Sequence, residues 1–346
     1  MFLTSFAYYR GIAIVLIVIG HCYGLSGWTF ASYPERVLAN ILTGGTVLFV
    51  FISGFLFHQV FYPGFDFWRF LTKKLRRVAT PYLLWSTLAL VLNLLTHTPL
   101  PDRFVGPDTS LWDQWLRPAL LSLVTGGHFT AYWYIPFILV LFVAAPLAVR
   151  FIDLPRRTQV VLTGALLLCA AMVQRPINNI LVGQSVVFFL PVYLFGMLCS
   201  LERSRIYGWF SNKTLLLGSG VIGLSMVQSL VYAGAGSYHK APFVWNFLDI
   251  NLFQKLLLCL LGMVVLHRYE HRKIPLLSAL ASASFAIYFL HGWVIRGLDL
   301  LRPWLPAAGA LWLLPLIAGV VLLCSYALAL LIKKQFPRHS ALLIGW

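Results

Sequence analysis

The stretch that decides the fold is YRGIAIVLIVIGHCYGLSG, Tyr9 to Gly27. It is apolar and approaches the length of a bilayer span, yet it carries Arg10 at one end and His21 inside. At about 100° per residue, their spacing puts both side chains on one helix face, about 16 Å apart along the axis. With Arg10 at one membrane surface, His21 would lie near the middle of the bilayer. An ionisable group there is costly, so His21 is either functional or hydrogen-bonded to a neighbouring helix.

The composition places the rest of the chain in the membrane as well. Of 346 residues, 60% are hydrophobic, and the mean hydropathy of +0.83 excludes an ordinary soluble domain. Apolar runs repeat throughout, so we expect an all-α polytopic helical bundle formed by one membrane domain, 1–346, with no appended soluble domain. The first apolar stretch has no basic region before it and no clear cleavage site after it. We therefore expect a span there and not a signal peptide.

Ten spans are predicted from the positions of the apolar runs. A shorter stretch, 111–124, is too interrupted to cross a bilayer and is predicted to be an interfacial helix. The spans lie at about 9–27, 38–62, 79–96, 132–151, 158–174, 180–201, 214–233, 248–267, 276–298 and 308–332.

The basic residues sort the loops between two sides of the membrane. Of the 26 Lys and Arg residues, 18 fall on one side, Arg10 among them, and seven on the other, while Lys255 lies within a span. Lys and Arg gather in cytoplasmic loops, so both termini are predicted to be cytoplasmic, and the net charge of +16 does not indicate nucleic-acid binding. The five cysteines lie in apolar segments without metal-ligand spacing. We expect them to pack as small apolar residues, and we expect no metal site.

Three further features could carry chemistry. KKLRR (73–77), at the end of the loop before the third span, lies with Arg69 in a run of five positive charges that suits either a phosphate-bearing ligand or anionic lipid headgroups. His291, in SFAIYFLHGW, lies near or past the middle of the ninth span and is either functional or bonded to a carbonyl. Lys255 either snorkels outward or lines a cavity.

Carboxylates are missing from the predicted spans. All ten Asp and Glu residues fall in loops or at span ends, which disfavours a proton-driven transporter and leaves His21 without an evident buried carboxylate partner. Neither G-x-S-x-G nor G-x-x-x-x-G-K occurs, so the common hydrolase and phosphate-loop signatures are absent.

Five segments, taken in order, resemble the acyltransferase-3 family, whose members are multi-spanning bacterial membrane proteins that acylate glycans and related acceptors. The resemblance covers the whole chain, including the number of spans. The matching segments are R-G-x-A-x-x-x-x-x-x-x-H (Arg10 to His21), FISGFLF (51–57), KKLRRVATPYLLW (73–85), AYWYIPFILV (131–140) and SASFAIYFLHGWV (282–294).

The resemblance implies roles for individual residues. His21 corresponds to the catalytic residue, with Arg10 in the same motif. Lys74 and Arg77 correspond to a basic pair that holds the acyl donor, although Lys74 departs from the usual R-x-x-R and Arg76 could compensate for it. Acceptor-binding candidates are His128 in the largest outside loop, together with Trp133, Tyr288 and His291 in the matching segments.

The expected function is therefore an O-acyltransferase of the bacterial cytoplasmic membrane. It would move an acyl group, with acetyl favoured, from cytosolic acyl-CoA to a hydroxyl of a glycan or lipid-linked sugar, and His21 would act as general base. An acyl-histidine relay is left open. A flippase for lipid-linked glycans, in which Arg10 and His21 line a path, and a structural membrane scaffold are the alternatives.

Overall fold

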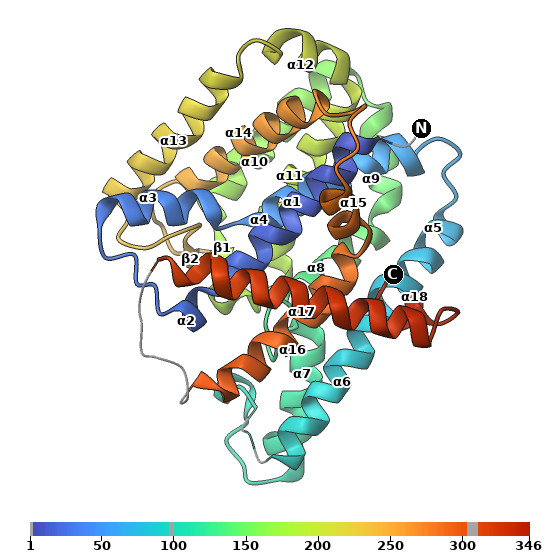
Figure 1. The fold of residues 1–346 in the computed structure, drawn as a ribbon, viewed down its shortest axis with the longest axis vertical. Helices are drawn as coiled ribbons and strands as arrows, with labels where there is room; N and C mark the ends of the chain where they lie inside the picture. Colours follow the sequence, from blue (N-terminus) through green and yellow to red (C-terminus); the bar gives the residue numbers. More distant parts are fainter. Residues whose placement is uncertain (1–2, 97, 99, 303–310) are drawn as a thin grey trace.

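The computed structural model describes residues 3–96, 98, 100–302 and 311–346, which are almost entirely helical (Figure 1). The strands are limited to two residues each: β1 (Arg175–Pro176) pairs in parallel with β2 (His239–Lys240). The longer helices, eight residues or more, are α1 (Thr4–His21), α3 (Tyr33–Leu42), α4 (Gly45–Leu56), α5 (Phe67–Lys74), α6 (Thr80–Leu95), α7 (Arg117–Thr125), α8 (Tyr134–Val143), α9 (Ala145–Asp153), α10 (Arg156–Val173), α11 (Val182–Leu201), α12 (Arg203–Phe210), α13 (Thr214–Val231), α14 (Ile250–His267), α15 (Pro275–Ser282), α16 (Ser284–Leu300) and α17 (Leu313–Gln335). Short helices are α2 (Tyr23–Ser26), α18 (Ser340–Leu343), the 3-10 turns η3 (Asp102–Phe104) and η5 (Ile177–Asn179), and the π-helical turns η1 (Phe57–Phe61), η2 (Leu75–Ala79) and η4 (Trp112–Leu116).

The predicted all-α membrane bundle is confirmed. Among the described residues, eight helical segments are long and apolar enough to cross a bilayer, and two bent helix pairs raise the number to ten if each pair is one span. The pairs are α8–α9, bent by 57°, and α15–α16, bent by 76°. Residues 308–310, the start of the predicted tenth span, lie outside the described residues.

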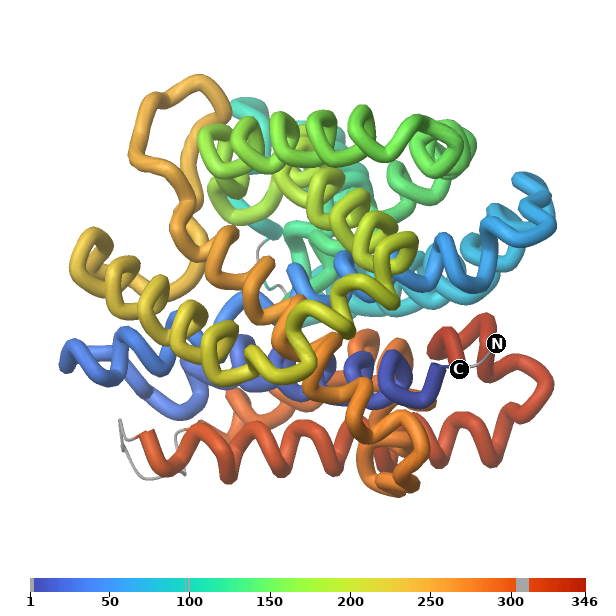
Figure 2. Tube along the Cα trace, turned by 90° about the horizontal axis from the view of Figure 1, so that it is seen from above, coloured from blue at the N-terminus to red at the C-terminus, as the bar shows by residue number. Residues whose placement is uncertain are grey.

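Helix α1, which carries the stretch quoted first, lies at the centre of the bundle. It packs against α4, α14, α15, α16 and α17. The ring of Phe6 stacks on Phe55 of α4 with centroids 3.6 Å apart, and the Tyr9 hydroxyl donates to the carbonyl of Cys259 in α14 at 3.1 Å. Figure 2 shows α10 and α17 at opposite edges of the molecule with α1 and α4 between them.

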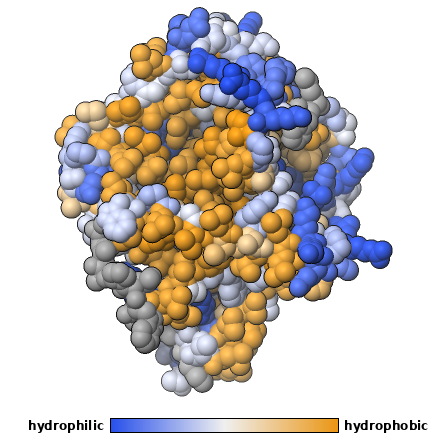
Figure 3. Space-filling model, viewed as in Figure 1, coloured by the Kyte–Doolittle hydropathy of each residue, from blue (hydrophilic) through white to orange (hydrophobic). Residues whose placement is uncertain are grey.

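Two glycines allow the closest helix crossing, between α4 and α11. A Cβ at Gly54 would lie 1.9 Å from the carbonyl oxygen of Tyr193, and one at Gly196 would lie 2.2 Å from that of Phe51. Small residues let backbones approach in this way in membranes, where association depends on close packing. The outer helices differ: only 22% of the most apolar stretch of α10 or α17 is buried, against 61% in α11. The exposed apolar surface of α17 forms part of the hydrophobic face in Figure 3, and such a surface is suited to lipid.

At each end of the bundle, contacts join loops that were predicted, from their Lys and Arg residues, to lie on the same side of the membrane. At one end the Thr4 amide donates to Glu270 at 2.7 Å, and Arg156 forms an ion pair with Glu202 at 2.8 Å. At the other end, the pairing of β1 with β2 joins the loop after α10 to the loop after α13. The two termini lie on the same side in Figures 1 and 2. That this side faces the cytoplasm stays a prediction.

Two sequence-based details differ in the structure. Helix α1 covers Thr4–His21, not 9–27, so His21 is its last residue and does not lie inside a longer span. The basic cluster was expected to end a loop, but it lies within the continuous helical segment Phe67–Leu95. The reason is Asp66, whose side chain caps α5 by accepting from the Arg69 amide at 2.6 Å.

Two other predictions concern single elements. The stretch 111–124 is helical, as η4 and α7, and Trp112 and Leu120 on it are exposed; its place at a membrane interface stays a prediction. Lys255 neither snorkels nor lines the cavity described below. It is fully buried, and its Nζ donates to the carbonyls of Asn40 and Ile41, at 2.7 and 2.8 Å, in the last turn of α3. A cation there satisfies carbonyls that have no partner within the helix.

Candidate active site

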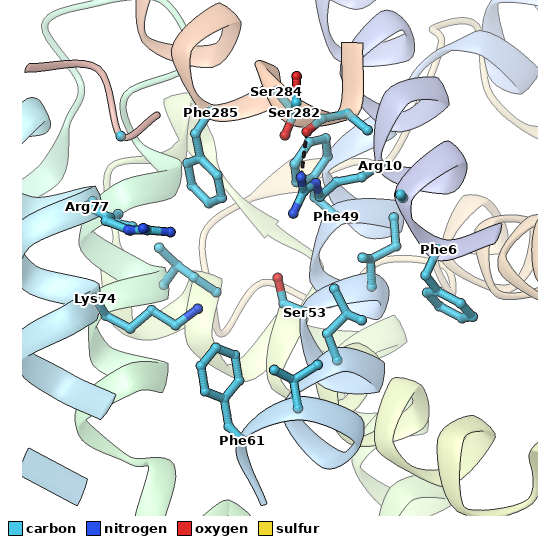
Figure 4. A pocket seen from close by; sticks show the side chains of 18 of the residues that line it. Phe6, Arg10, Phe49, Ser53, Phe61, Lys74, Arg77, Ser282, Ser284 and Phe285 are labelled. Carbon is cyan, nitrogen blue, oxygen red and sulfur yellow. Dashed lines mark hydrogen bonds between the residues drawn. The ribbon is translucent and has the colours of Figure 1, made fainter. Parts of the chain in front are cut away.

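A cavity of about 740 Å³ lies between α1, α4, the α5–η2 segment, α8 and the bend between α15 and α16. Figure 4 shows Lys74 and Arg77 pointing into it from one wall, with Arg10 and Ser53 on the opposite wall. Aromatic rings, among them Phe49, Phe61 and Phe285, line the walls between the polar groups. The cavity is thus a largely apolar pocket with a few convergent polar side chains, which is typical of a small-molecule site.

The charged side chains among the described residues of the cavity lining are all positive. Arg10, Lys73, Lys74 and Arg77 line the cavity, and no acidic side chain is among the described residues of the lining. The Lys74 ammonium lies over the rings of Phe61 and Phe142, 4.6 and 4.7 Å from their centroids. Aromatic faces stabilise a cation without neutralising it. The four positive charges therefore remain available to an anionic ligand.

The helical spacing explains why two of the three predicted donor-binding residues share this cavity. Lys74 and Arg77 are three residues apart and lie on one helix face, whereas Arg76 lies about 200° around the axis from Lys74. Arg76 accordingly does not line the cavity and instead lines a neighbouring hollow of about 590 Å³ together with Arg69. Lys73 and Arg77 border both spaces. The π-helical turn η2 carries Arg76 and Arg77, and such turns often occur at functional sites.

Arg10 is held at the bend between α15 and α16. Its Nη2 donates to the carbonyl of Ala281 at 2.5 Å, in the last turn of α15, while its Nε is buried without a partner among the described residues. Gly11 makes this approach possible, because a Cβ there would lie 2.8 Å from the carbonyl oxygen of Leu277. Arg10 therefore both positions the bend and presents positive charge to the cavity.

His21 lies beyond the cavity and does not line it. Its ring faces that of His291, with centroids 5.4 Å apart and planes inclined by 42°. His291 is completely buried, and its Nδ1 lies 2.7 Å from the carbonyl oxygen of Tyr288 and 3.1 Å from that of Ile287. His21 and His291, which are 270 positions apart in the sequence, thus form one pair.

The comparisons with known proteins give one finding. The sequence model of the acyltransferase-3 family, described as an acyltransferase domain, matches residues 3–342. The chain belongs to the acyltransferase-3 family. No curated protein and no solved structure matches it. Family membership together with the apolar helices makes this chain a multi-pass membrane acyltransferase, which needs an acyl donor, an acceptor and a lipid bilayer.

Within this acyltransferase, aromatic rings connect the cavity to the histidine pair. Tyr134 lines the cavity and its ring lies 5.7 Å, centroid to centroid, from that of Tyr288. The Tyr288 ring lies 5.9 Å from that of His291, which in turn faces His21. Tyr288 and His291, two of the predicted acceptor-binding residues, are therefore close to His21. Whether they bind the acceptor stays a prediction.

The other two predicted acceptor-binding residues lie apart from the pair. Trp133 packs against Phe189 and against the guanidinium of Arg175, whose central carbon lies 4.8 Å from the centroid of a Trp133 ring. The Nδ1 of His128 donates to the Ser122 carbonyl at 2.9 Å, and burial lowers the pKa of His128 to about 4. No contact joins His128 to His21 or His291 among the described residues.

Sequence reasoning missed several residues of the site. Ser53 and Tyr134 line the cavity; both lie in segments that match the family, 51–57 and 131–140, but neither was predicted as a site residue. Arg175 was counted merely as an outside-loop charge, but its Nη2 donates to Asn179 at 2.8 Å, and burial lowers its pKa to about 10. Hydropathy and charge do not show that these residues face the site, because their placement depends on how distant helices pack. Within the described ranges, no three His, Cys, Asp or Glu side chains gather as a metal site would require.

Proposed function

We propose that this acyltransferase moves an acyl group, with acetyl favoured, from cytosolic acyl-CoA to a hydroxyl of a glycan or lipid-linked sugar in a bacterial cytoplasmic membrane. The observation that carries the proposal is the cavity lined by four cations without an acidic side chain among its described residues. Coenzyme A carries several phosphate charges at one end and its thioester at the other. Arginine and lysine side chains bind phosphate strongly, arginine through paired hydrogen bonds.

The arrangement of the cavity suits the two ends of this donor. Arg77 and Lys74 would hold the phosphates, and Arg10 would bind deeper along the same ligand. The pantetheine arm would then follow the apolar lining toward Tyr134 and the rings beyond it. The spacing from Arg10 to His21 corresponds to about 16 Å along α1, so the reacting end must lie well inside the protein. The acceptor would approach His21 from the opposite end of the bundle.

His21 is the proposed general base. The acceptor hydroxyl would give its proton to a ring nitrogen of His21 as its oxygen bonds to the thioester carbonyl carbon. The carbon–sulfur bond then breaks, and the proton passes from His21 to the departing thiolate, so that free CoA and an acyl ester result. Histidine suits this exchange because its ordinary pKa lies close to neutral pH.

The test is acyl transfer by the purified protein in detergent. Labelled acetyl-CoA is supplied with a glycan fraction, and the products are followed by mass spectrometry. His21→Ala should lose roughly 10²- to 10⁴-fold in turnover, which is the usual contribution of general acid–base catalysis. Its melting temperature should change little, because His21 is partly exposed and forms no hydrogen bond to another described residue. Near-normal turnover would refute the assignment of His21, and glycan movement without modification would instead support a flippase.

A further inference from the structure

The proton of His291 is fixed by its own helix. Both atoms near Nδ1 are backbone carbonyl oxygens, of Ile287 and Tyr288, and carbonyls only accept hydrogen bonds. The Nδ1 atom must therefore carry a proton. In a neutral imidazole the other nitrogen, Nε2, is then a bare acceptor. This Nε2 is buried and has no hydrogen-bond partner among the described residues.

Burying a hydrogen-bond acceptor without a partner costs free energy, so a group near Nε2 that could donate to it would offset this cost. The neighbouring ring is that of His21, at a centroid separation of 5.4 Å. A centroid separation of 5.4 Å leaves room for one hydrogen bond between the rings when a nitrogen of each points toward the other. Hydrogen bonds of catalytic groups are often long before substrate binds and shorten in the reacting complex. Neither histidine has a hydrogen bond or ion pair to any acidic side chain in the described part of the chain.

We propose that Nε2 of His291 accepts a hydrogen bond from the ring N–H of His21 and thereby orients His21 for catalysis. The inference rests on the proposed function and assigns the role that a carboxylate plays in a Ser-His-Asp triad. His291 is a positioning residue. It keeps its own Nδ1 proton throughout, while the acceptor's proton goes to the other nitrogen of His21 and leaves from there to the thiolate.

A neutral partner suits this location in the bundle. A carboxylate would have to be desolvated at the buried end of the site, whereas an imidazole brings no charge. Its lone pair still fixes the tautomer of His21 and stabilises the imidazolium that forms when His21 takes the proton. The two carbonyl contacts hold the His291 ring in place, as outer hydrogen bonds orient the ligands of other sites.

The experiment compares substitutions of His291 that keep or remove an acceptor. His291→Leu has none, while His291→Gln offers an amide oxygen. With His291→Leu we expect roughly a 10²-fold loss in kcat and an unchanged KM for acetyl-CoA. His291→Gln should recover part of that loss at the same KM. If His291→Leu fails to fold, His291→Phe retains a ring against Tyr288 without an acceptor and takes its place. His267→Leu, which removes a histidine stacked on Tyr207 far from this pair, should leave turnover unchanged.

A double substitution distinguishes a working pair from two independent residues. If His291 acts through His21, the variant with both His21→Ala and His291→Leu should turn over no more slowly than His21→Ala alone. Losses that multiply, wild-type kcat in His291→Leu, or a Gln variant no better than the Leu variant would each overturn the inference. These outcomes are separate from failure of the proposed function, which would appear as the absence of acyl transfer by the wild-type protein.

Discussion

Replacing Arg77 by methionine should weaken the binding of CoA more than any step of the chemistry. The Arg77 side chain points into the cavity opposite Arg10, in a lining that has four cations and no acidic residue among those described (Figure 4). A hydrogen bond to a charged group contributes about 1.5 to 3 kcal/mol. Because about 1.4 kcal/mol is a factor of ten in affinity, the dissociation constant for CoA should rise by about 10- to 100-fold.

The assay is equilibrium binding of CoA to the purified protein in detergent, repeated over a range of salt concentration. Arg77 is exposed, so its contribution should also be partly screened, and the affinity of Arg77→Met should depend less on salt than that of the wild type. Turnover at saturating acetyl-CoA should remain near normal, because the substitution leaves His21 untouched. The matched control is Arg150→Met, which removes the same charge from an exposed position on α9.

Two results would refute this reasoning. A change in the dissociation constant within about twofold would mean that Arg77 does not hold the donor. Equal weakening by Arg150→Met would mean that overall charge, and not the cavity, attracts CoA. In either case the basic cluster would return to the alternative role of contacting anionic headgroups.

Three further predictions concern the donor site, the topology and stability. Lys74→Arg should retain CoA binding, because arginine can also lie over the surrounding rings and binds phosphate, whereas Lys74→Met should weaken it about tenfold in the same binding assay. The topology can be tested in a protein that lacks the five native cysteines. A cysteine replacing exposed Thr109 should react with a thiol label from outside intact cells, and a cysteine replacing exposed Arg157 should react only after permeabilisation. The reverse pattern would place the cationic cavity on the side of the membrane away from cytosolic acyl-CoA. Burial lowers the pKa of His128 to about 4 in the folded protein, whereas a histidine in an unfolded chain has a pKa of about 6.5. Between these two values the unfolded chain binds more protons than the folded protein, so the free energy of unfolding should fall as the pH drops from 6.5 toward 4. His128→Gln should flatten that part of the melting-temperature profile relative to the wild type, and an unchanged profile would exclude this contribution.

Much of the architecture could be predicted because hydrophobicity and charge act locally. Apolar runs alone predicted ten spans, which agrees with the structure if each of the two bent helix pairs is counted as one span. The basic residues assigned the loops to two sides, and loops assigned to the same side contact each other in the structure. Helix boundaries were less accurate. Hydropathy does not change at Thr4 or after His21, and the end of α1 depends on the turn that follows it.

The site could be predicted only in part. Helical periodicity grouped Arg10 with His21, whereas the pairing of Lys74 with Arg77 came from the family resemblance, and both of these basic residues line the cavity. The pairing of His21 with His291 and the burial of Arg175 against Trp133 depend on contacts between segments far apart in the sequence. The same is true of Lys255, whose partners are carbonyls that become available only where α3 ends. Backbone acceptors at helix ends leave no sign in a hydropathy pattern.

The spacing in R-G-x-A-x-x-x-x-x-x-x-H can now be explained by packing. Gly11 lets the backbone of α15 approach closely enough for Arg10 to reach Ala281. Ala13 is fully buried, and its carbonyl oxygen would lie 3.2 Å from a Cβ added at Gly45 of α4. A larger side chain at this crossing would therefore push the two helices apart. The small residues thus fix α1 between α15 and α4, the helices that contribute Ser282 and Ser53 to the cavity. With α1 held in this way, a rigid helix places His21 about 16 Å from Arg10, at the helix end where the ring meets His291. A substitution of Gly11 by valine should therefore impair both donor binding and turnover although it removes no reacting group, because it would displace the helix that carries Arg10 and His21.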